Sequence, residues 1–326
     1  MSDTAIAMAH PNIALVKYWG KRDAELNLPA AGSLSITLDT LHTRTRVSRR
    51  DDEADRVVLN GGEDPAQTRR VSRFLDRLRA LAKVPGALEV ETENNFPTAA
   101  GLASSASGFA ALTVAADAVL ELDLDPASLS RYARMGSGSA ARSLFGGFVE
   151  MHAGRQPDGG DAVAEPLLGP RDWPLDVVVA ITSRQTKAAG STDAMERSRQ
   201  TAPFYAAWVT STEDDLAAAR AAVRARDFER LADVAEHSCL KMHATMLATR
   251  PPLLYWNPAT LAAIQAVRAL RADGTPVFFT VDAGPQVKAI CLPEASDRVR
   301  EALETISGVE ETVVVGLGEG AQLISP

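Results

Sequence analysis

The sequence predicts an α+β fold, in which strands and helices mix without a regular alternation. Short segments with strand character fill much of the first sixty residues, whereas helical patterns occupy residues 68–82, residues 104–120 and much of the region after residue 228. No repeated strand–helix–strand unit connects them, so a purely parallel sheet is not expected. The 326 residues are enough for two domains. We place these domains at residues 1–175 and 176–326.

The composition excludes several classes of protein. Hydrophobic residues make up 46% of the chain and charged residues 23%, so long disordered stretches are not expected. The net charge of -8 argues against a nucleic-acid partner, and no apolar run is long enough to cross a membrane. No signal peptide precedes Asn12, and neither Cys239 nor Cys291 belongs to a CxxC pair. These features predict a cytoplasmic protein that binds neither nucleic acid nor membrane.

The elements of the first half follow from the spacing of apolar residues. Residues 68–82 are apolar at intervals of three and four, which predicts a helix. Strands are expected at Ile13–Lys17, Ser33–Leu38, Thr43–Val47 and Arg56–Leu59.

A loop that enters a helix is the most informative local pattern. Residues 94–103 are irregular and contain glycine, and the serines at 104, 105 and 107 then open an alanine-rich helix that reaches Leu120. Serine is a preferred residue at a helix N-terminus. The free backbone N–H groups of such an end bind phosphate. An ordinary capped helix after a flexible loop has the same composition, so the loop alone does not decide between the two.

The second half begins after a linker-like stretch at Gly154–Asp172, rich in glycine, proline and aspartate. Asn257 and Pro258 form a helix start, with asparagine as the cap and proline at the first helical position. Expected here are a strand at Val177–Ile181, helices at Phe228–Met246 and Pro258–Arg271, a strand at Val277–Val281, and a turn at Asp282–Pro285.

Five segments, in order along the chain, resemble those of one enzyme family. The longest is ENNFPTAAGLASSASG at residues 93–108. The others are NIALVKYWGKR at 12–22, GSGSAARS at 136–143, GSTDAM at 190–195 and TVDAGP at 280–285. The segment at residues 93–108 is similar to the phosphate motif of the GHMP kinase superfamily, and the five segments together resemble the diphosphomevalonate decarboxylase family.

This resemblance implies a fold and a reaction. The fold is the two-lobed GHMP kinase fold, with an N-terminal lobe like ribosomal protein S5 domain 2 and a ferredoxin-like C-terminal lobe. The reaction is the ATP-dependent decarboxylation of 5-diphosphomevalonate to isopentenyl diphosphate, by way of phosphorylation at C3. The resemblance also implies Mg²⁺ arriving with ATP, and a homodimer.

The same resemblance assigns three catalytic residues. Asp282, held where a strand ends in a Gly-Pro turn, would direct the C3 hydroxyl or accept its proton. Arg142 offers a planar guanidinium that suits the substrate carboxylate. Lys17 would reach the reacting centre while Lys21 contacts a phosphate.

Further binding residues follow from the matched segments. Asn12 is expected to orient Asp282 or the carboxylate, and Arg70 to contact the diphosphate in preference to Arg69. The remaining substrate-binding candidates are Tyr18, Trp19, Gly20, Lys21, Ser137, Gly138, Ser139, Ala140, Ala141 and Ser191. The ATP candidates are Pro97, Gly101, Leu102, Ala103, Ser104, Ser105 and Ala106.

The sequence leaves three other functions open. A 5-phosphomevalonate decarboxylase differs only in how many cations meet the phosphates, and a mevalonate 3-kinase would stop after phosphorylation. A non-catalytic ligand-binding homologue is the third. No metal site is predicted, since His237 and His243 lie six residues apart and do not share a helical face.

Overall fold

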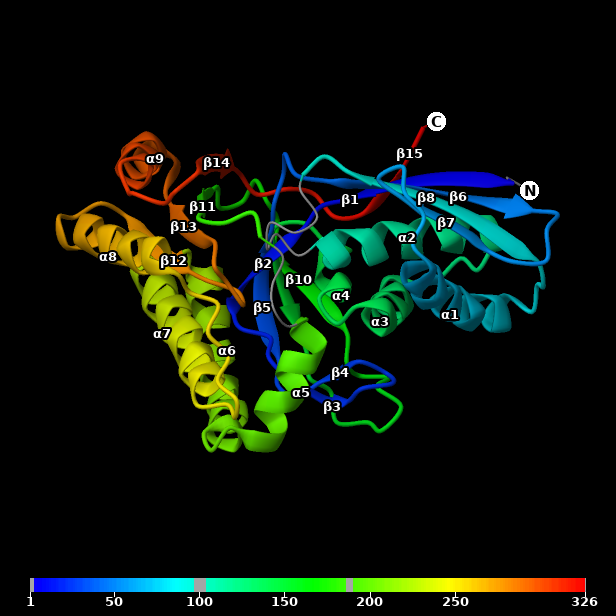
Figure 1. Cartoon of the computed structure of the whole chain (residues 1–326), viewed down its shortest axis with the longest axis horizontal. Coiled ribbons are helices and arrows are strands. Elements are labelled where there is room, and N and C mark those ends of the chain that lie inside the picture. The colour runs from blue at the N-terminus through cyan, green and yellow to red at the C-terminus, as the bar shows by residue number, and fades with distance from the viewer. Residues whose placement is uncertain (1–2, 97–103, 186–189, 326) are drawn as a thin grey trace.

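The computed structural model describes residues 3–96, 104–185 and 190–325, and it confirms the α+β class (Figure 1). A mixed five-stranded sheet has the order β15-β1-β6-β8-β7, in which β7 is parallel to β8 and the other pairs are antiparallel. Its strands are β15 (Gln322–Ile324), β1 (Thr4–Ala9), β6 (Thr43–Arg50), β8 (Ala87–Asn94) and β7 (Arg56–Leu59).

The described residues form three other sheets, and all of the strand pairs in them are antiparallel. One contains β10 (Ala164–Leu168), β9 (Phe148–Met151), β5 (Ser33–Thr37) and β2 (Asn12–Val16). Another contains β12 (Val277–Thr280), β13 (Val287–Cys291), β11 (Asp176–Ile181) and β14 (Glu311–Val315). The smallest pairs β3 (Lys21–Asp23) with β4 (Leu28–Pro29).

The helices cover these sheets in two groups (Figure 1). The first group is α1 (Pro65–Ala82), α2 (Ser104–Leu120), α3 (Pro126–Gly136) and the short α4 (Ala140–Ser143). The second is α5 (Ser191–Thr201), α6 (Tyr205–Ala225), α7 (Phe228–Leu247), α8 (Pro258–Ala272) and α9 (Ser296–Glu304), preceded by a 3-10 turn at Pro293–Ala295. None of the helices in the described part of the chain is long and apolar enough to cross a membrane.

Helix α2 forms the core of the first half by packing against β1 and β6. Small residues make this possible, since Ala110, Ala111 and Ala115 are fully buried and let the helix lie close to the sheet. In the second half, α7 packs against both β2 and β12. It therefore bridges a strand from near residue 12 and a strand from near residue 280, which are the two regions that supply the site.

Each predicted strand and helix occurs in the structure to within a few residues, but α3, α5, α6 and α9 are among the elements that were not predicted. Strand β10 lies inside the stretch that was expected to be only a linker, 154–172. The final strand, β15, pairs with β1 in the first half of the molecule rather than with the second. The proposed division at residue 175 stays a prediction, and it would place β15 apart from the sheet that contains it.

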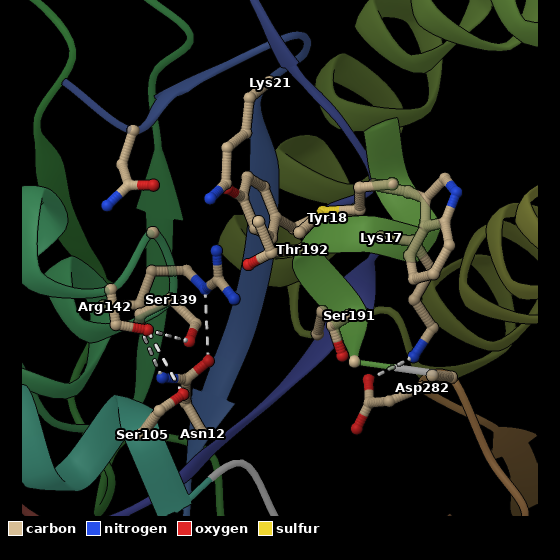
Figure 2. A pocket seen from close by; sticks show the side chains of 18 of the residues that line it. Asn12, Lys17, Tyr18, Lys21, Ser105, Ser139, Arg142, Ser191, Thr192 and Asp282 are labelled. Carbon is tan, nitrogen blue, oxygen red and sulfur yellow. Dashed lines mark hydrogen bonds and ion pairs between the residues drawn. The ribbon is translucent and has the colours of Figure 1, made fainter. Parts of the chain in front are cut away.

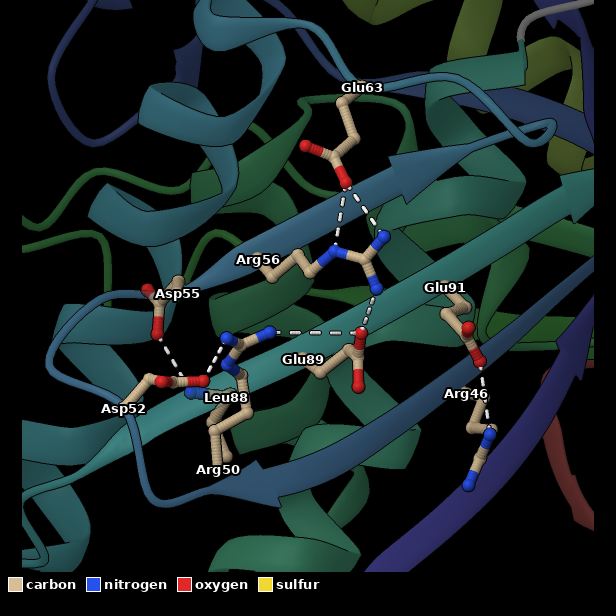
Figure 3. Close-up of polar contacts among 9 residues, drawn as sticks. All are labelled: Arg46, Arg50, Asp52, Asp55, Arg56, Glu63, Leu88, Glu89 and Glu91. Atoms are coloured by element: carbon tan, nitrogen blue, oxygen red, sulfur yellow. Dashed lines mark hydrogen bonds and ion pairs between the residues drawn. The ribbon is translucent and has the colours of Figure 1, made fainter.

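Charged pairs lie along strands β6, β8 and β7 of the five-stranded sheet (Figure 3). Arg46 on β6 lies opposite Glu91 on β8, with 3.1 Å between Nη1 and Oε2. Arg56 on β7 contacts Glu89 at 2.6 Å and Glu63 at 2.8 Å. Such cross-strand pairs favour the observed register, but exposed ion pairs contribute little free energy.

Candidate active site

A cavity of about 540 Å³ lies where residues from the two halves of the chain meet. Four cations and one carboxylate are among its described lining residues, so its local charge opposes the net charge of the protein. The lining comprises Asn12, Ala14, Lys17, Tyr18, Trp19, Lys21, Asn27, Arg70, Ser104, Ser105, Gly136, Ser137, Gly138, Ser139, Arg142, Gly190, Ser191, Thr192, Met195, Met242, Asp282 and Ala283.

The cavity brings together most of the predicted site residues, including Asp282, Arg142 and Lys17. Four of the described candidates do not line it. Ala106, Ala140 and Ala141 are fully buried in the core, and Gly20 packs against Tyr205 instead. Pro97, Gly101, Leu102 and Ala103 lie outside the described residues.

Asp282 pairs with Lys17 at one side of the cavity (Figure 2), and a second lysine, Lys288, contacts its other carboxylate oxygen. Lys17 Nζ lies 2.8 Å from Oδ1, and Lys288 Nζ lies 3.2 Å from Oδ2. Both lysine side chains are 1% exposed, whereas the aspartate is 27% exposed and lines the cavity. Burial alone would raise the pKa of the Asp282 carboxyl, but the two ammonium groups outweigh it and hold that pKa well below its usual range.

Helix α7 fixes the backbone on both sides of this cluster. Ser238 Oγ accepts a hydrogen bond from the Lys17 backbone N–H at 3.0 Å. Cys239 Sγ accepts from the Val281 N–H at 3.2 Å, and His243 Nε2 lies 3.2 Å from the Val281 carbonyl. Burial lowers the pKa of His243 to about 4, so its ring is neutral near pH 7 and donates to that carbonyl.

Lys288 is a member of the Asp282 cluster that the sequence analysis missed. It lies on β13, six positions after Asp282, and its neighbours on the strand are the buried Val287, Ala289 and Ile290. A lysine inside an apolar strand requires a buried partner, because an unpaired ammonium is costly to remove from water. A lysine among the apolar residues of the segment VKAIC was therefore the feature of the sequence that could have indicated a buried ion pair.

Arg142 is held on the other side of the cavity by neutral groups (Figure 2). Its Nη1 donates to Ser33 Oγ at 2.8 Å and its Nε donates to Asn12 Oδ1 at 3.2 Å. Burial lowers the pKa of Arg142 to about 10, with Tyr18 and Asp282 acting in the opposite direction, so the group remains a cation at neutral pH. The guanidinium is 2% exposed.

Asn12 was expected to orient either Asp282 or the substrate carboxylate, and its contacts do not support the first of these roles. Asn12 Nδ2 donates to the Ser139 carbonyl at 3.0 Å and to Ser143 Oγ at 2.8 Å. Its Oδ1 accepts from Arg142, so within the described structure Asn12 orients the arginine and not the aspartate. The reason is topological, since Asn12 opens β2 beside α4 while Lys17 follows the far end of the same strand.

Aromatic residues and glycines shape the wall of the cavity between Asp282 and Arg142. The Arg142 guanidinium carbon lies 5.8 Å from the centre of the Tyr18 ring. A Cβ at Gly138 would lie 2.3 Å from the Tyr18 hydroxyl, so only glycine fits there. Gly20 has φ +109° and a Cβ on it would meet the Tyr205 hydroxyl at 2.0 Å. Trp19 Nε1 donates to Ser198 Oγ at 3.0 Å, which anchors this segment to α5.

Lys21 and Arg70 supply further positive charge to the cavity. Arg70 Nη2 donates to the Gly136 carbonyl at 3.1 Å, and its guanidinium carbon lies 4.6 Å from the centre of the Phe109 ring. Burial and the neighbouring Arg70 lower the pKa of Lys21. Arg70 lines the cavity whereas Arg69 does not, in agreement with the preference for Arg70.

Two helix N-termini also line the cavity. Ser104 and Ser105 begin α2, and Ser105 Oγ lies 3.2 Å from Ser137 Oγ. Ser191 begins α5 after Gly190. Free backbone N–H groups and the positive ends of the helix dipoles favour anions at both places. Among the described residues, no cluster of three or more histidine, cysteine, aspartate or glutamate side chains could hold a metal ion.

Comparison with known proteins gives consistent matches along the chain. A family model described as the diphosphomevalonate decarboxylase-like N-terminal domain matches residues 9–164. A second, the mevalonate 5-diphosphate decarboxylase C-terminal domain, matches residues 177–316. A diphosphomevalonate decarboxylase of Aspergillus fumigatus is 38% identical over 325 residues, covering 93% of this chain and 80% of that protein.

Solved structures give the same result. MDDEF in complex with MVAPP, AMPPCP and magnesium has a TM-score of 0.91 at 40% identity, with 99% of both chains covered. The mevalonate diphosphate decarboxylase from Enterococcus faecalis, in a structure on mevalonate diphosphate-mediated ATP binding, has a TM-score of 0.90 at 39% identity and the same coverage. These neighbours confirm the two-lobed GHMP kinase fold that the sequence predicts.

Proposed function

The chain belongs to the diphosphomevalonate decarboxylase family, and on that premise we propose that it decarboxylates (R)-5-diphosphomevalonate with ATP. The products are isopentenyl diphosphate, ADP, phosphate and CO2. One observation supports this most strongly. A single cationic cavity has on one side a carboxylate, Asp282, that is held by two lysines, and on the other side a buried arginine, Arg142, whose partners are neutral.

Asp282 acts on the C3 hydroxyl. A tertiary alcohol must be aimed at the γ-phosphorus, and a fixed carboxylate oxygen can accept its hydrogen bond and then its proton. The geometry supports this role because Asp282 is the only carboxylate among the described lining residues. Lys17 holds one of its oxygens at 2.8 Å.

Arg142 orients the substrate carboxylate. Its partners Ser33 and Asn12 are uncharged, so its positive charge is available for an anionic group that enters the cavity. Once phosphate leaves C3, the bond to the carboxylate carbon must be aligned with the forming alkene. A planar guanidinium whose side chain is fixed by its own hydrogen bonds can hold that alignment. Its role is then to orient the carboxylate, and this does not require tighter binding as CO2 departs.

The remaining cations and helix ends receive phosphates. We assign the 5-diphosphate to Lys21, Arg70, Ser139 and Ser191, and the ATP phosphates to the N-terminus of α2 at Ser104 and Ser105. ATP is bound with Mg²⁺, which neutralises phosphate charge.

The cellular location and assembly are separate proposals. We infer a cytoplasmic enzyme, since both Cys239 and Cys291 are free thiols buried in the core, as is typical of a reducing compartment. We also infer a homodimer, by analogy with the family alone. Light scattering on the purified protein measures its mass directly, and a mass of one chain at micromolar concentration would reject the dimer.

A direct assay tests the proposed reaction. CO2 release is measured with ATP and 5-diphosphomevalonate, 5-phosphomevalonate or mevalonate in parallel. We expect the diphosphate to give by far the highest kcat/KM, with one ADP formed per CO2. Preference for the monophosphate would assign a 5-phosphomevalonate decarboxylase. ADP without CO2 would indicate a 3-kinase, and no turnover of any substrate a ligand-binding homologue.

A further inference from the structure

Lys288 has a position that packing alone does not explain. It is the second residue of β13, a strand that lies between β11 and β12, and its side chain is 1% exposed. Removing an ammonium group from water is costly unless a carboxylate and hydrogen bonds compensate. An apolar side chain would fill the same space without that cost, and the strand supplies apolar residues on both sides of it.

The carboxylate that compensates Lys288 already has another cation. Asp282 receives Lys17 at Oδ1 and Lys288 at Oδ2, so two ammonium groups share one carboxylate inside the protein. The two lysines arrive from different strands, Lys17 after β2 and Lys288 from β13. Together they constrain both oxygens and thus the plane of the carboxylate, which a single contact would leave free to rotate.

We propose that Lys288 is a positioning residue for the reaction, which holds Oδ2 of Asp282 and keeps the carboxylate ionised and turned toward the C3 hydroxyl. The inference rests on the proposed function. Lys288 does not line the cavity, so it acts through Asp282 and not on the substrate. Its effect has two parts, one on the direction of the carboxylate and one on its affinity for protons.

The other groups facing Asp282 do not replace this charge. Lys17 lies at its first oxygen, Cys239 and His243 face it from α7, and Arg142 acts on it from α4 across the cavity. Burial raises the pKa of Cys239 and lowers that of His243 to about 4, so both are neutral near pH 7. Removing Lys288 therefore raises the pKa of Asp282, because a stabilising cation at 3.2 Å is lost and the burial remains.

The test compares Lys288→Met and Lys288→Gln with the wild type, using CO2 release from 5-diphosphomevalonate. Methionine removes both charge and donor, whereas glutamine keeps a donor and removes the charge. The acid limb of kcat/KM against pH reports the ionisation of the free enzyme, and activity needs the ionised carboxylate. We expect that limb to move to higher pH in both variants by about one unit or more. We also expect kcat to fall by about 10–100-fold, with a smaller change in the KM of the substrate.

Lys241→Met is the matched control. Lys241 is a partly buried lysine of the same half of the molecule, paired with Asp215 at 2.6 Å and outside the cavity lining. Its loss should leave the acid limb in place. An unshifted limb in either folded Lys288 variant would overturn the inference, as would a fall in kcat without a shift.

The Asp282→Asn background gives a second arm. With no carboxylate to position, Lys288→Gln should cause little further loss, and the two effects should be strongly non-additive. An equal loss in both backgrounds would mean that Lys288 acts elsewhere and would reject the proposal. A wild-type protein that releases no CO2 refutes the proposed function itself, whereas an active wild type with unaltered Lys288 variants refutes only the inference.

Discussion

The two sides of the cavity satisfy their charged groups in opposite ways. On one side, the Asp282 carboxylate is neutralised by two lysine ammonium groups within 3.2 Å. On the other, the buried Arg142 guanidinium bonds only to neutral oxygens of Ser33 and Asn12 among its described contacts. Each arrangement costs desolvation energy, but only the first recovers it within the protein.

This difference indicates what each side does. A carboxylate with both oxygens held is already in its working geometry, so it can act on a hydroxyl as soon as substrate arrives. A buried arginine without a carboxylate partner in the described structure gains most when an anion enters. The Asp282 side is therefore expected to serve phosphorylation and the Arg142 side to serve loss of CO2.

The largest expected effect comes from removing the charge on the first side. Asp282→Asn keeps the size of the side chain but cannot accept the hydroxyl proton. We expect turnover to fall by about 10²–10⁴-fold, with a small change in the KM of the substrate. ADP formation and CO2 release should fall together, because phosphorylation comes first. Near-normal turnover of a folded variant, checked by circular dichroism, would remove Asp282 from the mechanism.

A smaller effect is expected where neither side is altered. Ser105→Leu places a bulky side chain at the N-terminus of α2, where the ATP phosphates are assigned. The KM for ATP should rise by about tenfold or more, equivalent to losing roughly one charge-assisted hydrogen bond. Ser105→Ala, which removes the hydroxyl without filling space, is the control and should change less. An unaltered ATP KM in Ser105→Leu would assign this helix end to capping alone.

The smallest effect is expected at the exposed ion pairs of the five-stranded sheet. Arg46 and Glu91 are 45% and 42% exposed (Figure 3), so water and salt screen their attraction. Arg46→Ala should lower the free energy of unfolding by less than about 1 kcal/mol, measured by urea denaturation. CO2 release should be unaffected. A loss of several kcal/mol would show that this exposed pair stabilises the fold much more than exposure allows, and would contradict the contrast with the buried charges.

Much of the fold could be predicted because local patterns and the final contacts agree. The spacing in residues 68–82 indicates a helix, and α1 spans Pro65–Ala82. Asn257 caps α8 with the expected side-chain bond to the Thr260 N–H. The pairing of β15 with β1 could not be predicted, because it joins segments about 315 residues apart and depends on the finished tertiary structure.

The sequence predicted which residues belong to the site better than it predicted the contacts that they make. Five matched segments identified Lys17, Arg142 and Asp282, and all three line one cavity. They did not identify the partner of Asn12, because a side chain at a strand start can turn toward either neighbour. Lys288 was missed since it lies outside the matched segments and does not itself reach the cavity.

The division of labour between the two sides is tested most directly by Arg142→Lys. Lysine keeps a positive charge but loses the planar two-point contact with a carboxylate. We predict a fall of about 10²-fold in CO2 release, since misalignment by about 1 Å has that cost. Phosphorylation at C3 should slow much less than the breakdown that follows it.

The measurement is a rapid-quench time course with γ-labelled ATP and 5-diphosphomevalonate, which follows labelled intermediate and CO2 together. We predict that a 3-phosphorylated species accumulates early in Arg142→Lys and then decays with the release of CO2. Equal slowing of both steps, with no intermediate at any time, would contradict the separate roles of the two sides. Wild-type rates of CO2 release would remove Arg142 from the site.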